Sequence, residues 1–157
     1  MRKRVVVSLA AFGVAAAVLM IDGYVFRASL PPWYATMLRT ASTVDRLAYY
    51  LPRAVLEETI YRLLAVSAIA AGLLWGGLSE TAAWWLAIGV AQAINVAVSL
   101  PPPPDVLTLL YDGLRFFAPG LVWGWLYWRH GFVAAVSAHC AAHLLLQPAL
   151  SLAFADA

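Results

Sequence analysis

Long apolar runs, separated by short polar or proline-rich breaks, dominate the sequence and predict membrane-crossing helices. The runs cover residues 5–21, 54–75, 81–100, 116–128 and about 132–154. A helix needs about 20 residues to cross a bilayer, so the chain has room for about five crossings. The pattern therefore predicts an all-α fold, a polytopic membrane helix bundle in which residues 1–157 form a single integral membrane domain.

The first apolar run, residues 5–21, follows the basic residues Arg2, Lys3 and Arg4 and has two interpretations. It could be a secretory signal peptide or a first membrane span. We favour the span, because the run reaches the lower length limit for a crossing and no small-x-small cleavage site follows it before Asp22. The basic flank predicts a cytoplasmic N-terminus.

Residues 24–53 are less hydrophobic and contain four arginines, of which Arg39, Arg46 and Arg53 recur every seven residues. Apolar residues fill much of the opposite side of this pattern. We predict that Ala35–Leu51 form an interfacial amphipathic helix whose arginines meet lipid headgroups. The alternative, a solvated loop, does not explain the periodicity.

Proline and glycine residues predict the limits of the next spans. Pro52 suits the start of a helix and places the beginning of the second span at Ala54. Gly76–Glu80 is predicted to be a short turn, and Pro101–Pro104 a stiff extended connector. In the fourth span Gly120 and Gly124 are four residues apart, a spacing that predicts close packing against another helix.

The composition agrees with a membrane protein: 64% of the residues are hydrophobic and 11% are charged, whereas about a quarter are charged in soluble domains. The net charge of +2 comes from scattered basic residues, so we expect membrane lipids and no nucleic acid as partners. A single cysteine, Cys140, excludes an internal disulfide framework. The abundance of arginine and alanine is typical of a GC-rich bacterial genome, which predicts a multi-pass protein of the bacterial inner membrane.

Two adjacent carboxylates, Glu57 and Glu58, stand with Arg62 near the start of the second apolar run. Ionisable groups at membrane depth are costly and are rarely retained without a function. On a helix Glu58 and Arg62 lie four residues apart in the order that favours an ion pair, which leaves Glu57 as the freer carboxylate and the candidate general base. The alternative is a pair of acids that the helix dipole stabilises in the headgroup region.

Later spans carry further polar side chains. Gln92 and Asn95 share a helix face, where they could bond to a neighbouring helix or belong to a site. His139 and His143 are one turn apart, a spacing that suits a metal ion or one shared substrate atom. Polar groups at membrane depth satisfy one another only if they converge, so we predict one polar cavity that holds carboxylate, amide and imidazole groups. Such groups can activate water and stabilise an oxyanion.

These motifs resemble those of the CPBP family of intramembrane proteases, which includes the type II CAAX prenyl endopeptidases and the abortive-infection proteins. The family's first motif, EExxxR, is matched by Glu57–Arg62, and its last, HxxxN or a variant, by His139–His143. Between them, Phe116–Gly131 is similar to the family's glycine-rich run before the histidine helix. The resemblance covers about residues 50–147 and implies an intramembrane endopeptidase that cleaves a membrane-embedded or lipid-linked protein or peptide.

The resemblance also implies a role for each motif residue. Glu57 would be the base that activates water, and His139 would stabilise the oxyanion or transfer a proton. Glu58 and Arg62 would form a structural ion pair.

The sequence departs from the family in two places. Asn95 stands where the middle motif, FxxxH, has its histidine, and His143 stands where the last motif usually has asparagine. Because asparagine cannot relay a proton, one alternative is a catalytically impaired membrane scaffold or immunity factor. A second alternative is a metal-dependent form of the same protease in which His139, His143 and Glu57 hold zinc. Otherwise no cofactor is expected.

Overall fold

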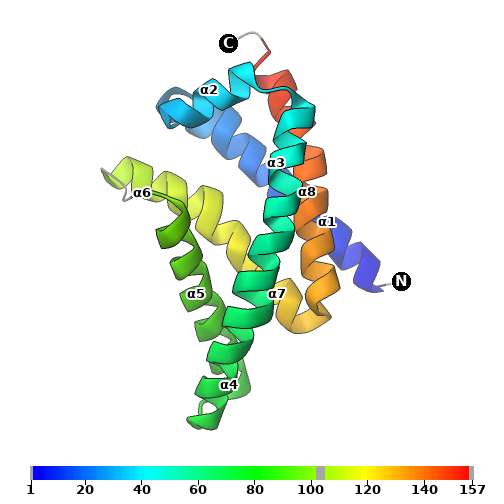
Figure 1. Ribbon diagram of the computed structural model, residues 1–157, viewed down its shortest axis with the longest axis vertical. Coiled ribbons are helices and arrows are strands. Elements are labelled where there is room, and N and C mark those ends of the chain that lie inside the picture. Colours follow the sequence, from blue (N-terminus) through cyan, green and yellow to red (C-terminus); the bar gives the residue numbers. More distant parts are fainter. Residues whose placement is uncertain (1, 102–104, 156–157) are drawn as a thin grey trace.

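The computed structural model describes residues 2–101 and 105–155, and this part of the chain consists of helices joined by short turns, without a strand (Figure 1). In chain order the helices are α1 (Arg2–Met20), η1 (Ile21–Val25), η2 (Arg27–Ser29), α2 (Pro32–Thr40), α3 (Thr43–Glu57), η3 (Glu58–Val66), α4 (Ser67–Trp75), α5 (Glu80–Ser99), α6 (Val106–Asp112), η4 (Gly113–Phe117), α7 (Ala118–His130) and α8 (Phe132–Ala153). The segments η1, η3 and η4 are wider π-helical turns, and η2 is a 3₁₀ turn. The prediction of an all-α helix bundle is confirmed.

Helix α8 lies at the centre of the bundle, where it packs against α1, α3 and α7 (Figure 1). Its buried face carries small side chains at helical spacing, including Ala135, Ala138 and Ala142. Helix α1 buries Ala11 and Ala15 in the same core. Small residues let helix backbones approach closely, which is how helices associate where lipid provides no hydrophobic driving force. The predicted first span is therefore an integral part of the bundle.

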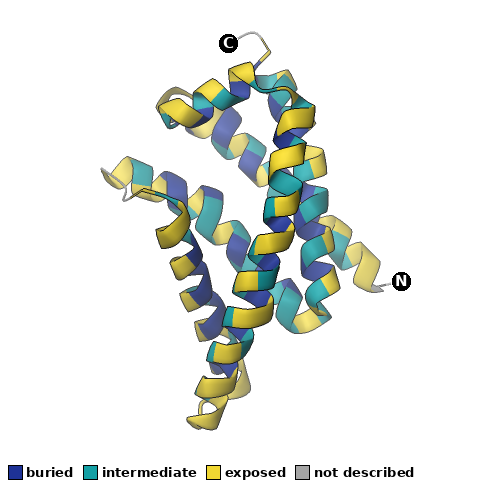
Figure 2. Cartoon of the chain, viewed as in Figure 1, coloured by how far each residue is buried: buried dark blue, intermediate teal, exposed yellow. Residues whose placement is uncertain are grey.

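Within the part of the chain that the structure describes, three helical segments are long and apolar enough to cross a membrane: Lys3–Val25, Glu80–Ser99 and Phe132–Ala153. They agree with the first, third and fifth predicted spans. Many large apolar side chains of these helices and of η3 are exposed, for example Leu9, Leu64 and Leu144. Figure 2 shows exposed positions recurring along the helices. Such side chains are more stable in lipid than in water. The other two predicted crossings lie in helical runs that also carry charged residues, and they stay predictions.

The second predicted span does not begin after Pro52, because α3, η3 and α4 form one helical run from Thr43 to Trp75 with Pro52 in its interior (Figure 1). The prediction of a single interfacial helix over Ala35–Leu51 is also wrong, because α2 and α3 share this stretch. It is divided at Ser42, whose hydroxyl accepts a hydrogen bond from the Asp45 amide while the Asp45 side chain accepts one from the Ser42 amide. This reciprocal cap ends the preceding segment and starts α3.

Arg46 does not face lipid headgroups as predicted, because it is buried between α2, α3 and α8. Its guanidinium donates hydrogen bonds to the carbonyl oxygens of Leu38 and Ala41 at the C-terminal end of α2. It also donates to Gln147 and Ser151 of α8. A cation is favourable beside the carbonyl end of a helix, so Arg46 fixes the end of α2 against the central helix. Arg39 is exposed, as expected for a headgroup contact.

The helical run α6–η4–α7 packs against α5 through its glycines. A Cβ atom on Gly120 would lie 1.9 Å from Cδ of Gln92, and one on Gly124 would lie 2.4 Å from Cγ2 of Ile88. The predicted close packing is therefore confirmed. Gly131, with a φ of 84°, lies between α7 and α8 in a backbone conformation that glycine adopts without steric cost.

The predicted turn Gly76–Glu80 is observed between α4 and α5, with Glu80 as the first residue of α5. Of the predicted proline connector, residues 102–104 lie outside the described residues.

Candidate active site

A cavity of about 300 Å³ lies between α1, α3, η3, α5, α7 and α8. Its polar lining includes the four predicted catalytic residues, Glu57, Asn95, His139 and His143. Apolar side chains such as Val18 and Leu146 line other parts of the wall. Residues from three segments of the sequence thus meet around one cavity, as the predicted convergence requires. Their catalytic roles stay predictions.

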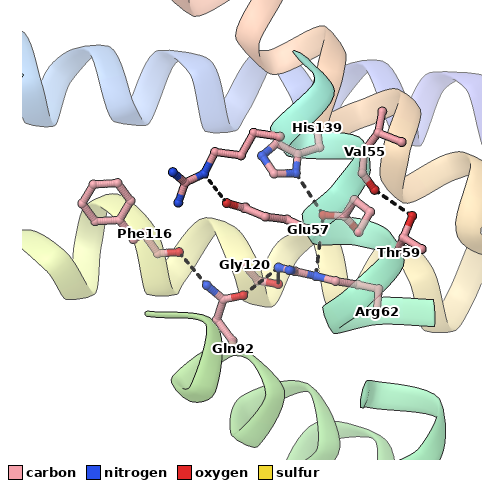
Figure 3. Close-up of polar contacts among 10 residues, drawn as sticks. Val55, Glu57, Thr59, Arg62, Gln92, Phe116, Gly120 and His139 are labelled. Carbon is pink, nitrogen blue, oxygen red and sulfur yellow. Dashed lines mark hydrogen bonds and ion pairs between the residues drawn. The ribbon is translucent and has the colours of Figure 1, made fainter. Parts of the chain in front are cut away.

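The adjacent carboxylates Glu57 and Glu58 have different surroundings. Figure 3 shows Glu57 among Arg62, Gln92, Gly120 and His139, which line the same cavity. Glu57 lines the cavity and accepts a hydrogen bond from Nε of Arg53, with 2.7 Å between Nε and Oε1. Glu58 is completely buried behind the cavity wall. The π-helical segment begins at this boundary, and wider turns of this kind occur frequently at functional sites. Glu57 is therefore the carboxylate that a molecule in the cavity can reach, although it is not free, because Arg53 holds it.

Glu58 contacts two groups rather than the one predicted. Its Oε1 atom lies 3.6 Å from Nε of Arg62, a loose ion pair, and 2.9 Å from Nδ1 of His139. When Glu58 is ionised its carboxylate only accepts hydrogen bonds, so Nδ1 of His139 is then the donor, and Nε2 is the ring nitrogen without a hydrogen bond to the described residues. A carboxylate that orients a histidine in this way is a recurring part of catalytic sites. Sequence reasoning missed this contact, since 81 positions separate the two residues.

Stacked rings hold the two histidines. His139 lies between the indole of Trp123, at 5.1 Å between ring centroids, and the imidazole of His143, also at 5.1 Å. His143 stacks in turn on Tyr50, at 4.9 Å. The side-chain amide of Gln147 is 3.5 Å from Nδ1 of His143, at the outer limit of a hydrogen bond. Packing therefore restricts how far either imidazole can rotate.

The two amides of α5 differ in what they contact. Gln92 accepts a hydrogen bond from Nη2 of Arg62 at 2.7 Å and donates one to the carbonyl oxygen of Phe116 at 3.1 Å. It therefore connects three helical segments, as the helix-packing interpretation expected. Asn95 lines the cavity and accepts a hydrogen bond from Ser99 of its own helix. Its amide NH₂ group makes no hydrogen bond to the described residues, so it is available to a ligand of the cavity.

The residues proposed as zinc ligands do not fit a metal site. Among the described residues, no three histidine, cysteine, aspartate or glutamate side chains form a group that could hold a metal ion. His139 and His143 stack face to face with 27° between their planes, Nδ1 of His139 is held by Glu58, and Glu57 is held by Arg53. Nitrogen and oxygen donors therefore do not converge on one point, as tetrahedral zinc requires.

A second buried polar cluster beside the cavity was missed by the sequence analysis. The Asp22 carboxylate is fully buried and accepts hydrogen bonds from Nε of Arg115, at 2.9 Å, and from the hydroxyl of Tyr34, at 2.7 Å. The Tyr111 hydroxyl also donates to it. Arg115 lines the cavity, so this cluster joins the end of α1 to the cavity wall. Asp22 and Arg115 are 93 positions apart, and no local pattern connects them.

The comparison with protein families agrees with this arrangement. The family described as type II CAAX prenyl endopeptidase Rce1-like matches residues 39–145, more than half of the chain. The chain belongs to this family. The resemblance drawn from the EExxxR and histidine motifs is thereby confirmed, and the matched segment includes Glu57, Asn95, His139 and His143. The Rce1-like family and the three apolar helices together identify an integral membrane protein of a CAAX protease type. No curated protein and no solved structure matches the chain.

Proposed function

We propose that this Rce1-like protein is an intramembrane endopeptidase in which Glu57 activates water against a peptide bond. The observation that carries the proposal is the cavity, because its lining includes a carboxylate, an amide and two imidazoles in a chain of this family. These are the groups that general base catalysis and oxyanion stabilisation need. The apolar remainder of the wall supports a substrate that is lipid-linked or membrane-embedded.

In the proposed reaction, water attacks the carbonyl carbon of the peptide bond while Glu57 takes one of its protons. The amide NH₂ of Asn95 donates a hydrogen bond to the oxygen that becomes negatively charged. The carbon–nitrogen bond then breaks, and the departing nitrogen receives a proton as a carboxylic acid and an amine form. His139 is oriented by Glu58 and lies beside His143, so the imidazoles assist this proton transfer.

This mechanism gives Glu58 a different role from the purely structural one predicted from the motif. Its contact with Nδ1 of His139 is closer than its contact with Arg62, 2.9 Å against 3.6 Å. Replacing Glu58 should therefore change the kinetics as well as the folded yield. Arg62, which reaches Gln92 and the carbonyl oxygen of Gly120, keeps the structural role.

The test uses purified protein in liposomes and a fluorogenic peptide with a farnesylated cysteine followed by three residues, the tail that defines a CAAX sequence. Glu57→Gln and His139→Ala should each lower kcat by about 100-fold to 10,000-fold, the usual cost of losing a general acid or base. Glu80→Gln is the matched control, because Glu80 is an exposed glutamate at the start of α5, away from the cavity. It should retain the native rate.

Cleavage at the native rate by folded Glu57→Gln would refute the proposed base. If the native protein cleaves neither this peptide nor an unlipidated membrane peptide, the non-enzymatic alternative, a membrane scaffold or immunity factor, replaces the proposal. Asn95, at the place of the family's histidine, is the feature that would then explain the loss of activity.

A further inference from the structure

Arg53 is one helical turn before Glu57 and is the side chain that holds it. Its Nε donates to Oε1 of Glu57 at 2.7 Å, and its Nη1 donates to the hydroxyl of Tyr49, also at 2.7 Å. Both Arg53 and Tyr49 line the cavity. Among the described residues, no other group forms a hydrogen bond with the Glu57 carboxylate. The orientation of Glu57 therefore depends on Arg53.

An ordinary helix-surface ion pair does not explain this contact. The Arg53 side chain is 38% exposed and that of Glu57 is 21% exposed, and exposed pairs contribute little to stability. Glutamate placed four residues before a cation is the more favourable order, and here the order is reversed. The contact is nevertheless short, and Tyr49 fixes the guanidinium from the other side. Its effect is directional: it fixes Oε1 of the carboxylate and leaves Oε2 without a hydrogen bond to the described residues.

We propose that Arg53 is a positioning residue that holds Glu57 in the orientation in which it activates water. The inference rests on the proposed function of Glu57. A base accelerates proton transfer only when it is held within hydrogen-bond reach of the reacting water. Without Arg53 the Glu57 carboxylate is free to rotate about its side-chain torsions, and it spends less time in the productive orientation. The orienting group is thus on the same helix as the base, one turn earlier.

The experiment compares Arg53→Ala, Arg53→Met and Arg53→Lys in the proteoliposome assay with the farnesylated peptide. Displacement of a catalytic group by about 1 Å costs about 100-fold in rate, so we expect kcat of Arg53→Ala to fall by about that factor. KM should stay within about threefold, because the substrate does not lose a binding partner. Arg53→Lys keeps a cation near Glu57 but cannot bind Tyr49 at the same time, so it should recover part of the loss.

Added methylguanidinium should restore part of the activity of Arg53→Ala, because it returns the guanidinium without the tether. This rescue separates positioning from a loss of fold, which a small cation would not repair. Arg39→Ala is the matched control, since Arg39 is an exposed arginine of α2 without a hydrogen bond or ion pair to the described residues. It should show the native kcat and no response to methylguanidinium.

The outcomes separate this inference from the proposed function. Native kcat in Arg53→Ala together with an inactive Glu57→Gln overturns the role of Arg53 alone. A rise in kcat also overturns it, because Arg53 would then obstruct Glu57. If Arg53→Ala does not accumulate as folded protein, Arg53→Met decides, since its side chain keeps much of the length of arginine but has no hydrogen-bond donor. Native kcat in that variant overturns the inference. An active Glu57→Gln instead refutes the proposed function.

Discussion

Gly120→Ala should destabilise the fold by disrupting the connection between α5, η3 and α7. The new Cβ would lie 1.9 Å from Cδ of Gln92, so the Gln92 amide must move. Movement breaks its hydrogen bonds with Arg62, at 2.7 Å, and with the carbonyl oxygen of Phe116, at 3.1 Å. A bond to a charged group contributes about 1.5–3 kcal/mol and a neutral one about 0.5–1.5, so the expected loss in free energy of unfolding is about 2–4 kcal/mol.

Gly89→Ala is the matched control on α5, because a Cβ at Gly89 would meet nothing within 4 Å. It should be neutral or stabilising by about 0.5–1 kcal/mol, since glycine in a helix interior is less favourable than alanine. Both variants can be compared by denaturant titration in detergent with tryptophan fluorescence as the signal. The double variant Gly120→Ala with Gln92→Ala should cost little more than Gln92→Ala alone, because the clash is then absent. Native stability of Gly120→Ala, or strictly additive costs, would refute the argument.

Two further predictions concern the buried charges and the exchanged motif residues. Arg115→Ala should lower the free energy of unfolding by about 3–5 kcal/mol, because it leaves Asp22 buried without its cation. Adding Asp22→Asn should recover most of this loss, measured in the same denaturant titration. His143→Asn should lower kcat by about 100-fold to 10,000-fold, and adding Asn95→His should restore most of it, because an imidazole returns to the cavity. Native kcat in His143→Asn would show that this imidazole does not compensate for Asn95.

Much of the local structure could be predicted because its determinants are neighbours in the chain. Apolar runs predicted the positions of α1, α5 and α8, and glycines predicted the turn before α5. Where a local signal was overlooked, the prediction failed: Ser42 and Asp45 form a cap that divides the expected interfacial helix. That pattern of a serine with an acid three residues later was visible in the sequence.

The buried contacts of the arginines were not predictable from their spacing. Arg39, Arg46 and Arg53 form one seven-residue series, yet the first is exposed, the second is buried against α8, and the third holds Glu57. A helical period places residues on one face but does not say which parts of that face another helix covers. Burial of Arg46 depends on α2 and α8 meeting at that point, and 101 positions separate Arg46 from Gln147.

The sequence by itself determined which residue types are available for chemistry, because the motif letters place Glu57, His139 and His143 in apolar spans where charged and polar groups are costly. Tertiary structure decided their partners. It placed the Glu58 carboxylate beside Nδ1 of His139. It also placed Arg53, which is not part of the motif, within hydrogen-bond distance of Glu57. The physical reason is that hydropathy and capping act between residues near one another in the chain, whereas a buried polar group is satisfied by whichever helix packs against it.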